Sequence, residues 1–148
     1  MEIHPDFKEL LVLFNAHNVD YVIVGGFALA LHGAPRFTGD LDVLVRPNPA
    51  NARRVMTALA AFGFNLPWLS VDDFLAPDKV VQFGLPPVRI DLMTSITGVS
   101  WEDIGTHKVA GTLGDVPVFY LGREQFITNK RASGRKKDLA DIEALGEE

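Results

Sequence analysis

Residues 21–45 read YVIVGGFALALHGAPRFTGDLDVLV, and this stretch decides the fold. Its first four residues, Tyr21–Val24, form a continuous apolar run rich in β-branched side chains, which is typical of a strand buried on both faces. Gly25-Gly26 ends the run, residues 27–32 predict a short helix, and residues 41–45 predict a second strand. A strand that passes through glycines directly into a helix, with another strand after it, predicts an α/β arrangement.

The rest of the 148-residue chain continues this mixture of helices and strands. Apolar spacing predicts helices at residues 5–17, 48–62, 123–132 and 137–145, and a helical turn at 72–75. Short apolar runs predict strands at residues 80–83, 88–93, 108–112 and 116–121. Because no linker, repeat or low-complexity tract interrupts the pattern, we expect residues 1–148 to form one α/β (α+β) domain, with a mixed β-sheet flanked by helices.

Composition excludes several kinds of chemistry. The chain has no Cys, so disulfides, thiolate metal sites, iron–sulfur clusters and a Cys nucleophile are excluded. The longest uncharged run, residues 55–71, contains Gly63, Asn65 and Pro67 and is poorly suited to crossing a membrane. The N-terminus is acidic early and lacks the basic start of a signal peptide, so we expect a cytoplasmic protein without a membrane partner.

The net charge of −5 hides a basic segment near the C-terminus. Residues 123–137 hold six of the fourteen Lys and Arg residues and a single acid, Glu124, so this segment carries a local charge of +5. Such a segment could contact phosphates, although a solvated helix end is also compatible with it.

Gly25 and Gly26 stand where a phosphate could approach the backbone. Glycine adopts positive φ and lets a ligand come close to the chain. The free N–H groups at the start of the following helix favour an anion. Taken alone, the pair is also typical of a tight strand-to-helix turn that binds nothing.

Three acids are candidates for a metal site. Asp40 and Asp42 are two positions apart on a predicted strand, so both carboxylates project from one face. Asp91 interrupts the apolar strand predicted at 88–93, and it can complete a three-carboxylate site if that strand neighbours the first. Surroundings rich in oxygen and free of His and Cys suit Mg²⁺ or Mn²⁺. Solvated acids on half-exposed strands remain the alternative for each position.

The combination resembles the DNA-polymerase-β-like nucleotidyltransferase superfamily. That family's signature is a hydrophobic residue, Gly and Gly or Ser, a spacer of about this length, and then Asp, a hydrophobic residue and Asp or Glu on a strand. Here the signature is Val24-Gly25-Gly26 followed by Asp40-Leu41-Asp42-Val43. The Gly-Gly form, the segment Arg36-Phe37-Thr38-Gly39 and the basic tail 129–142 are similar to the AbiEii-like branch. That branch includes abortive-infection and toxin–antitoxin nucleotidyltransferases.

The resemblance implies an activity and a set of site residues. The activity is transfer of a nucleoside monophosphate from ATP or another NTP to an acceptor hydroxyl, with Mg²⁺ or Mn²⁺ as cofactor. Catalysis and metal binding would fall to three carboxylates: Asp40, Asp42 and Asp91. Nucleotide binding would fall to Gly25, Gly26, Arg36, Thr38 and Lys130. Arg36 and Thr38 are also compatible with a β-turn, and Lys130 with an amphipathic helix surface. Asp138 or Asp141 would support the helix pair that carries Lys130.

The acceptor and the partners stay open at this point. A tRNA 3′ end, a protein side chain and a small hydroxylated molecule are all compatible with the resemblance. Longer family members often carry a further helical domain that contacts the acceptor, and a partner protein of a toxin–antitoxin or phage-defence system could take its place. The alternative function is a catalytically silent binding module that keeps the fold and acts as an antitoxin-like protein partner.

Overall fold

The computed structural model describes residues 2–34, 39–85 and 88–147. The helices are α1 (Pro5–Ala16), α2 (Gly25–Leu31), α3 (Pro49–Phe62), α4 (Trp101–His107), α5 (Arg123–Ser133) and α6 (Lys136–Ala144), with a 3₁₀ turn η1 (Val71–Phe74). The strands are β1 (Tyr21–Val24), β2 (Asp40–Val45), β3 (Val80–Leu85), β4 (Val88–Met93), β5 (Val109–Leu113) and β6 (Val116–Tyr120). The α/β class expected from the sequence is confirmed.

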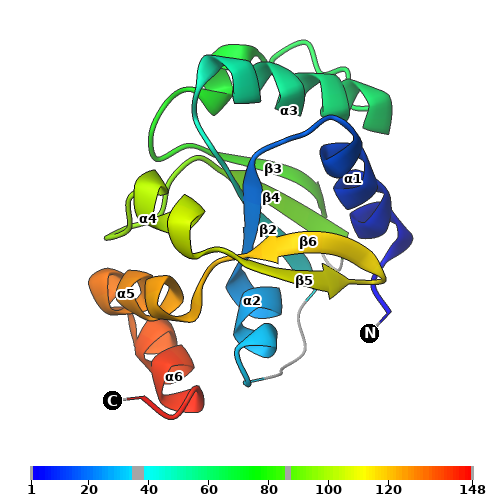
Figure 1. Cartoon of the computed structure of the whole chain (residues 1–148). Coiled ribbons are helices and arrows are strands. Elements are labelled where there is room, and N and C mark those ends of the chain that lie inside the picture. Colours follow the sequence, from blue (N-terminus) through cyan, green and yellow to red (C-terminus); the bar gives the residue numbers. More distant parts are fainter. Residues whose placement is uncertain (1, 35–38, 86–87, 148) are drawn as a thin grey trace.

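The six strands form one mixed sheet in the order β3-β4-β2-β1-β6-β5. The β2–β4 and β1–β6 pairs are parallel, and the remaining neighbours are antiparallel. In Figure 1, α3 lies above the sheet, whereas α2, α5 and α6 lie below it. The sheet brings β4 beside β2, although 42 residues, including α3 and β3, separate the two strands in the sequence. The connection between these parallel neighbours is a crossover that includes α3.

Strand β1 lies in the middle of the sheet and all four of its residues are buried, as its apolar sequence predicts. Helix α2 begins at Gly25, directly after β1, so both glycines belong to its first turn and do not precede it. A chain that leaves a central strand and turns at once into a helix places that helix's free N–H groups at the end of the sheet. This is the geometry on which a phosphate site depends.

One buried polar side chain links helix α3 to the ends of the central strands. The Asn51 amide oxygen accepts a hydrogen bond from the Asp20 N–H at 2.7 Å, and its amide nitrogen donates to the backbone oxygens of Asp20 and Arg46 at 3.0 and 2.9 Å. Asn51 is fully buried, and Asp20 and Arg46 flank the ends of β1 and β2. The side chain therefore joins α3 to the central strand pair and keeps β2 in register.

Helix α4 is the element that the sequence pattern does not predict. It spans only seven residues and has a single fully buried apolar side chain, Ile104, so its apolar periodicity is too short to detect. Ser100 caps its first turn by accepting a hydrogen bond from the Asp103 N–H. Within the described residues, no helix is long and apolar enough to span a membrane.

Candidate active site

Strand pairing brings the predicted carboxylates together. In the parallel β2–β4 pair, Asp42 lies opposite Asp91, and Asp40 lies opposite Arg89. In the antiparallel β1–β2 pair, Asp42 also lies opposite Val24, the last residue before the glycine turn. Asp42 is therefore the carboxylate at which β1, β2 and β4 meet.

Gly25 is in direct contact with Asp42. Its φ is +68°, a conformation that side-chain-bearing residues rarely adopt. A Cβ built on Gly25 would overlap the Asp42 carboxylate, with Asp42 Oδ2 as the nearest atom. Glycine is required here for two reasons, because the backbone conformation and the neighbouring carboxylate both exclude a side chain. Gly26 follows it, buried in the first turn of α2.

Arg89 is a functional candidate that sequence reasoning missed. Its guanidinium donates to Asp40 Oδ2 at 2.8 Å, and its Nε lies 3.4 Å from Asp91 Oδ1. The signal was present in the sequence, because Arg89 and Asp91 are two positions apart on one strand and so share a face. Arg89 places a positive charge among the acids and links Asp40 to Asp91.

The carboxylates are close enough to perturb one another. Burial, followed by the nearby Asp91 and Asp40 carboxylates, raises the pKa of Asp42 to about 7, and Arg89 offsets part of this effect. Burial also raises the pKa of Asp91, against the opposing influence of Arg89. The site thus holds more negative charge than its own cation neutralises, which is the condition that a bound cation relieves.

The donor set fits a divalent metal in chemistry, although its atoms are not gathered into a ligand cage. Arg89 Nε and Asp91 Oδ1 are buried, and neither makes a hydrogen bond with a described residue. Carboxylate oxygens are the ligands that Mg²⁺ and Mn²⁺ prefer. Across the described ranges, no three His, Asp or Glu side chains converge closely enough to hold a metal as they stand. One of the three carboxylates, that of Asp40, already accepts a hydrogen bond from the Arg89 guanidinium.

A pocket of about 230 Å³ opens beside this cluster. Its walls come from the end of β1 and the start of α2, from β2, from the segment before β3, from the end of β4 and the loop after it, from the residue after β6, and from α5 with the residue that precedes α6. The lining residues are Val24, Gly25, Asp42, Asp78, Met93, Ser95, Ile96, Thr97, Leu121, Phe126, Asn129, Lys130, Ser133 and Arg135. Of the residues predicted to act, Gly25, Asp42 and Lys130 share this pocket, whereas Gly26, Asp40 and Asp91 do not line it.

The Lys130 side chain is held in place by two acids of α6 and an aromatic ring of α5. Its side chain is only 12% exposed, and Nζ lies 3.4 Å from Asp138 Oδ1 and 3.5 Å from Asp141 Oδ2. The same ammonium lies 5.3 Å from the centre of the Phe126 ring. A largely enclosed cation that contacts two buried acids has little freedom to move, so Lys130 presents a fixed positive charge to the pocket.

Asp138 also orients a second cation of the pocket. Arg135 Nε donates to Asp138 Oδ2 at 2.7 Å, while the Arg135 side chain itself is 67% exposed. These hydrogen bonds, followed by the charge of Lys130, lower the pKa of Asp138, so this carboxylate stays ionised although it is buried. Asp138 is therefore shared by Lys130 and Arg135, and it aligns the end of α5 with the start of α6.

Two of the predicted nucleotide-binding residues, Arg36 and Thr38, lie outside the described residues. The pocket adds residues that the sequence did not single out for the site: Asp78, Ser95, Asn129, Ser133 and Arg135. Asn129 is held by a hydrogen bond from its amide nitrogen to the Thr97 backbone oxygen at 3.0 Å. No sequence signal marks Asp78 and Ser95, which come from other parts of the chain, whereas Asn129, Ser133 and Arg135 lie in the tail that the resemblance had already marked.

The protein is of the nucleotidyltransferase class, and in its fold a glycine turn lies against a strand carboxylate in the pocket that also holds a lysine. The chain belongs to the family described as nucleotidyltransferase of unknown function (DUF6036), whose model matches residues 2–146. Among curated proteins, none matches the chain in sequence.

Solved structures share the fold at low sequence identity. A Thermotoga maritima protein, provisionally assigned as a nucleotidyltransferase, has a TM-score of 0.59 and 14% identity over 95% of this chain and 88% of its own. The lincosamide antibiotic adenylyltransferase LnuA, solved with lincomycin bound, has a TM-score of 0.55 and 13% identity over 98% and 97% of the two chains. An antigenic nucleotidyltransferase-like protein from Paracoccidioides brasiliensis has a TM-score of 0.52 and 19% identity over 95% and 72%.

Proposed function

We propose that this chain is a metal-dependent nucleotidyltransferase that moves a nucleoside monophosphate from ATP or another NTP to an acceptor hydroxyl. The observation that carries the proposal is the meeting of Gly25, Asp42 and Lys130 in one pocket, although they come from three separate elements. A backbone turn with free N–H groups, a carboxylate and a fixed ammonium are the groups that a metal-bound triphosphate requires.

Each residue has a part that follows from its position. Gly25 and Gly26 bring the first N–H groups of α2 close to the triphosphate, and Lys130 neutralises charge on the pyrophosphate that leaves. Asp40, Asp42 and Asp91 would hold Mg²⁺ or Mn²⁺, and Asp91 would also accept the proton of the attacking hydroxyl. Divalent metal in such a site supplies charge stabilisation to the attacking and leaving oxygens. Arg36 and Thr38, which precede Asp40 in the sequence, belong to the same proposal as phosphate contacts.

Asp42 acts at pH 7 only after it loses its proton. Because the pKa of Asp42 is raised to about 7, metal binding competes with protonation of this carboxylate. Arg89 has to release Asp40 before all three acids can face one cation, since its guanidinium donates to that carboxylate. Activity is therefore expected to rise from pH 6 to pH 8.

The acceptor classes are a tRNA 3′ end, a protein side chain and a small hydroxylated molecule. We assign the chain to the AbiEii-like branch, acting with a toxin or antitoxin partner in a toxin–antitoxin or phage-defence system. A neighbouring gene for such a partner would support this setting. The small-molecule acceptor draws support from LnuA, whose length the chain matches over 97%.

The test is a labelling screen. Purified protein with Mg²⁺ is incubated with each of four labelled NTPs and with total tRNA or cell lysate, and label transferred to an acceptor is measured. Wild type is expected to label an acceptor, Asp42→Ala to abolish labelling, and the exposed-acid control Asp72→Ala to leave it unchanged. Equal labelling by wild type and Asp42→Ala would contradict the assignment of Asp42 to the active site.

A catalytically silent binding module is the second candidate, and Arg89 favours it. Its contacts with Asp40 and Asp91 already satisfy part of the negative charge without metal. Calorimetry with ATP, with and without Mg²⁺, separates the two functions. A module that only binds proteins should show no metal-dependent nucleotide binding, whereas the enzyme should show it and lose it in Asp42→Ala.

A further inference from the structure

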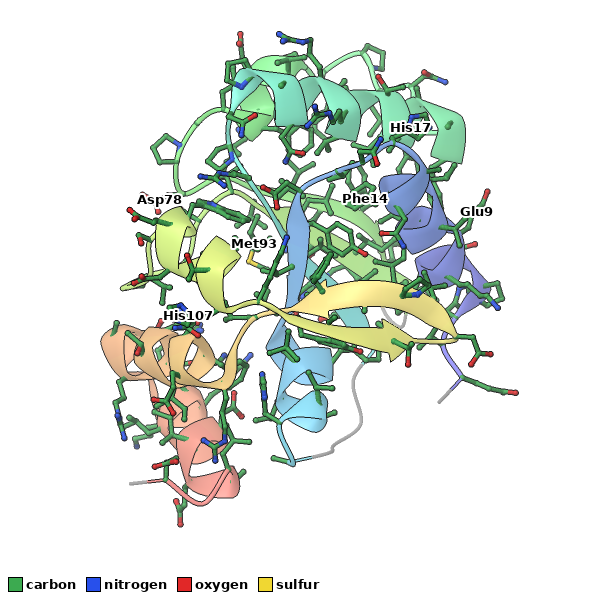
Figure 2. The ribbon with its side chains drawn as sticks, viewed as in Figure 1. Glu9, Phe14, His17, Asp78, Met93 and His107 are labelled. Carbon is green, nitrogen blue, oxygen red and sulfur yellow. The ribbon has the colours of Figure 1, made fainter. Side chains whose placement is uncertain are left out.

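One wall of the pocket has no part in the chemistry described above. It consists of Asp78, which precedes β3, and of the loop after β4 that includes Ser95. Figure 2 shows Asp78 above Met93, on the side away from α5 and α6 at the bottom of the view. The pocket is thus acidic at one end and carries Lys130 and Arg135 at the other.

The Asp78 carboxylate is held in one position by Ser95. The Asp78 N–H donates to Ser95 Oγ at 2.8 Å, and Ser95 Oγ donates in return to Asp78 Oδ1 at 2.8 Å. Asp78 has a φ of +55°, a conformation in which Asp and Asn are found more often than other side-chain-bearing residues. Its second carboxylate oxygen, Oδ2, makes no hydrogen bond with any described residue, so it remains available as an acceptor.

The turn that carries Asp78 is itself fixed to β4. Thr94, which is buried, donates from Oγ1 to the Ala76 backbone oxygen at 2.7 Å and accepts from the Lys79 N–H at 3.0 Å. The Thr94 N–H donates to the Lys79 backbone oxygen at 3.1 Å. Contacts on both sides of Asp78 therefore hold the carboxylate in place before a ligand arrives, which lowers the entropy cost of binding.

We propose that Asp78 recognises the nucleoside end of the bound NTP by accepting a hydrogen bond from a ribose hydroxyl or from an amino group of the base. The inference rests on the proposed function and adds to it the group that selects the nucleotide. The charges orient the ligand, because Lys130 and Arg135 attract the triphosphate and Asp78 repels it. The sugar and base are then left at the acidic end, beside an acceptor with a free oxygen.

The test compares Asp78→Asn with a matched control, Asp115→Asn. Asp115 also has positive φ, at +68°, but it lies in the turn between β5 and β6 and does not line this pocket. Asn keeps the shape of Asp, tolerates positive φ and can still accept from Ser95, so both variants should fold. Calorimetry measures the Kd of each of the four NTPs, and of inorganic tripolyphosphate as a probe of the phosphate end alone.

We expect Asp78→Asn to raise the Kd of the preferred NTP by about 10- to 100-fold, the usual effect of losing a hydrogen bond to a charged group. Binding of tripolyphosphate should be unchanged or tighter, because a negative charge has been removed from the far end. Asp115→Asn should match wild type with every ligand.

Analogues of the preferred NTP identify the hydrogen-bond donor. If the donor is a ribose hydroxyl, wild type binds the 2′-deoxy or 3′-deoxy form more weakly than the parent NTP. The Asp78→Asn variant then binds the deoxy form and the parent NTP with similar affinity. If the donor is an amino group, an analogue without that group behaves in this way. Either result supports the inference.

Three results would overturn it, and they differ from failure of the proposed function. If the preferred NTP binds Asp78→Asn as tightly as wild type, Asp78 does not recognise the nucleoside. The same conclusion follows if the substitution weakens tripolyphosphate binding as much as it weakens NTP binding. If every analogue responds alike in wild type and variant, no donor meets this carboxylate. If wild type binds no NTP at all, the proposed function fails together with the inference.

Discussion

Replacing Asp42 by Asn is expected to stabilise the metal-free protein. Burial and the neighbouring carboxylates raise the pKa of Asp42 from 3.8 to about 7. The folded state therefore binds this proton more tightly than the unfolded state does. The resulting stability is fully present below about pH 4 and is lost as the pH rises to about 7. The full loss corresponds to about 4 kcal/mol, of which about 2–3 kcal/mol falls between pH 5 and pH 8.

The assay is urea unfolding in EDTA at pH 5 and pH 8. Wild type should lose about 2–3 kcal/mol of unfolding free energy over this interval, and Asp42→Asn should lose less because its side chain does not ionise. The exposed-acid variant Asp72→Asn should follow wild type. Adding Mg²⁺ at pH 8 should restore stability to wild type and to Asp72→Asn, but not to Asp42→Asn, because binding to the folded state raises its stability.

A parallel change in the unfolding free energy of wild type and Asp42→Asn between the two pH values would contradict this prediction. Parallel curves would mean that Asp42 titrates alike in the folded and unfolded states, and that the carboxylates do not repel one another as their positions indicate. Stabilisation of Asp42→Asn by Mg²⁺ to the same extent as wild type would separately remove Asp42 from the metal site.

Three further substitutions test the other parts of the pocket. Arg89→Met should bind Mn²⁺ roughly fivefold more tightly in a fluorescence or EPR titration, because an ion pair worth about 1 kcal/mol no longer competes for Asp40. Gly25→Ala should cost at least about 1–3 kcal/mol of unfolding free energy and abolish tripolyphosphate binding, since positive φ and the Asp42 carboxylate both exclude a side chain. Lys130→Met should cost about 3–5 kcal/mol in urea unfolding, because it removes the ammonium that contacts two buried carboxylates, Asp138 and Asp141.

A control variant and the opposite outcomes show what each of these substitutions tests. Gly63→Ala is the comparison for Gly25→Ala, because Gly63 has a φ of +106° but no atom within 4 Å of an added Cβ. It should be destabilised by its backbone alone and should still bind tripolyphosphate. Weaker Mn²⁺ binding by Arg89→Met would show that the guanidinium helps to assemble the acids and does not compete with the metal. Unchanged stability of Lys130→Met would show that Asp138 and Asp141 do not depend on this ammonium.

Local patterns made much of the fold predictable. The apolar run at Tyr21–Val24 specifies a buried central strand, and Asn48 with Gly63 marks the two ends of α3. These signals act over a few residues, so they can be read without knowing what packs where. Helix α4 escaped prediction because seven residues with one buried apolar side chain carry too little periodicity.

Backbone geometry alone predicts that Asp40 and Asp42 share one face of a strand and that a buried strand runs through two glycines into a helix. Only the tertiary structure decided that β4 lies beside β2, which sets Asp91 opposite Asp42. It also decided that Arg89 reaches Asp40 and that Lys130 crosses to the pocket of Gly25. The reason is physical: strand order and helix docking depend on burial summed over the whole chain, and no short segment contains that information.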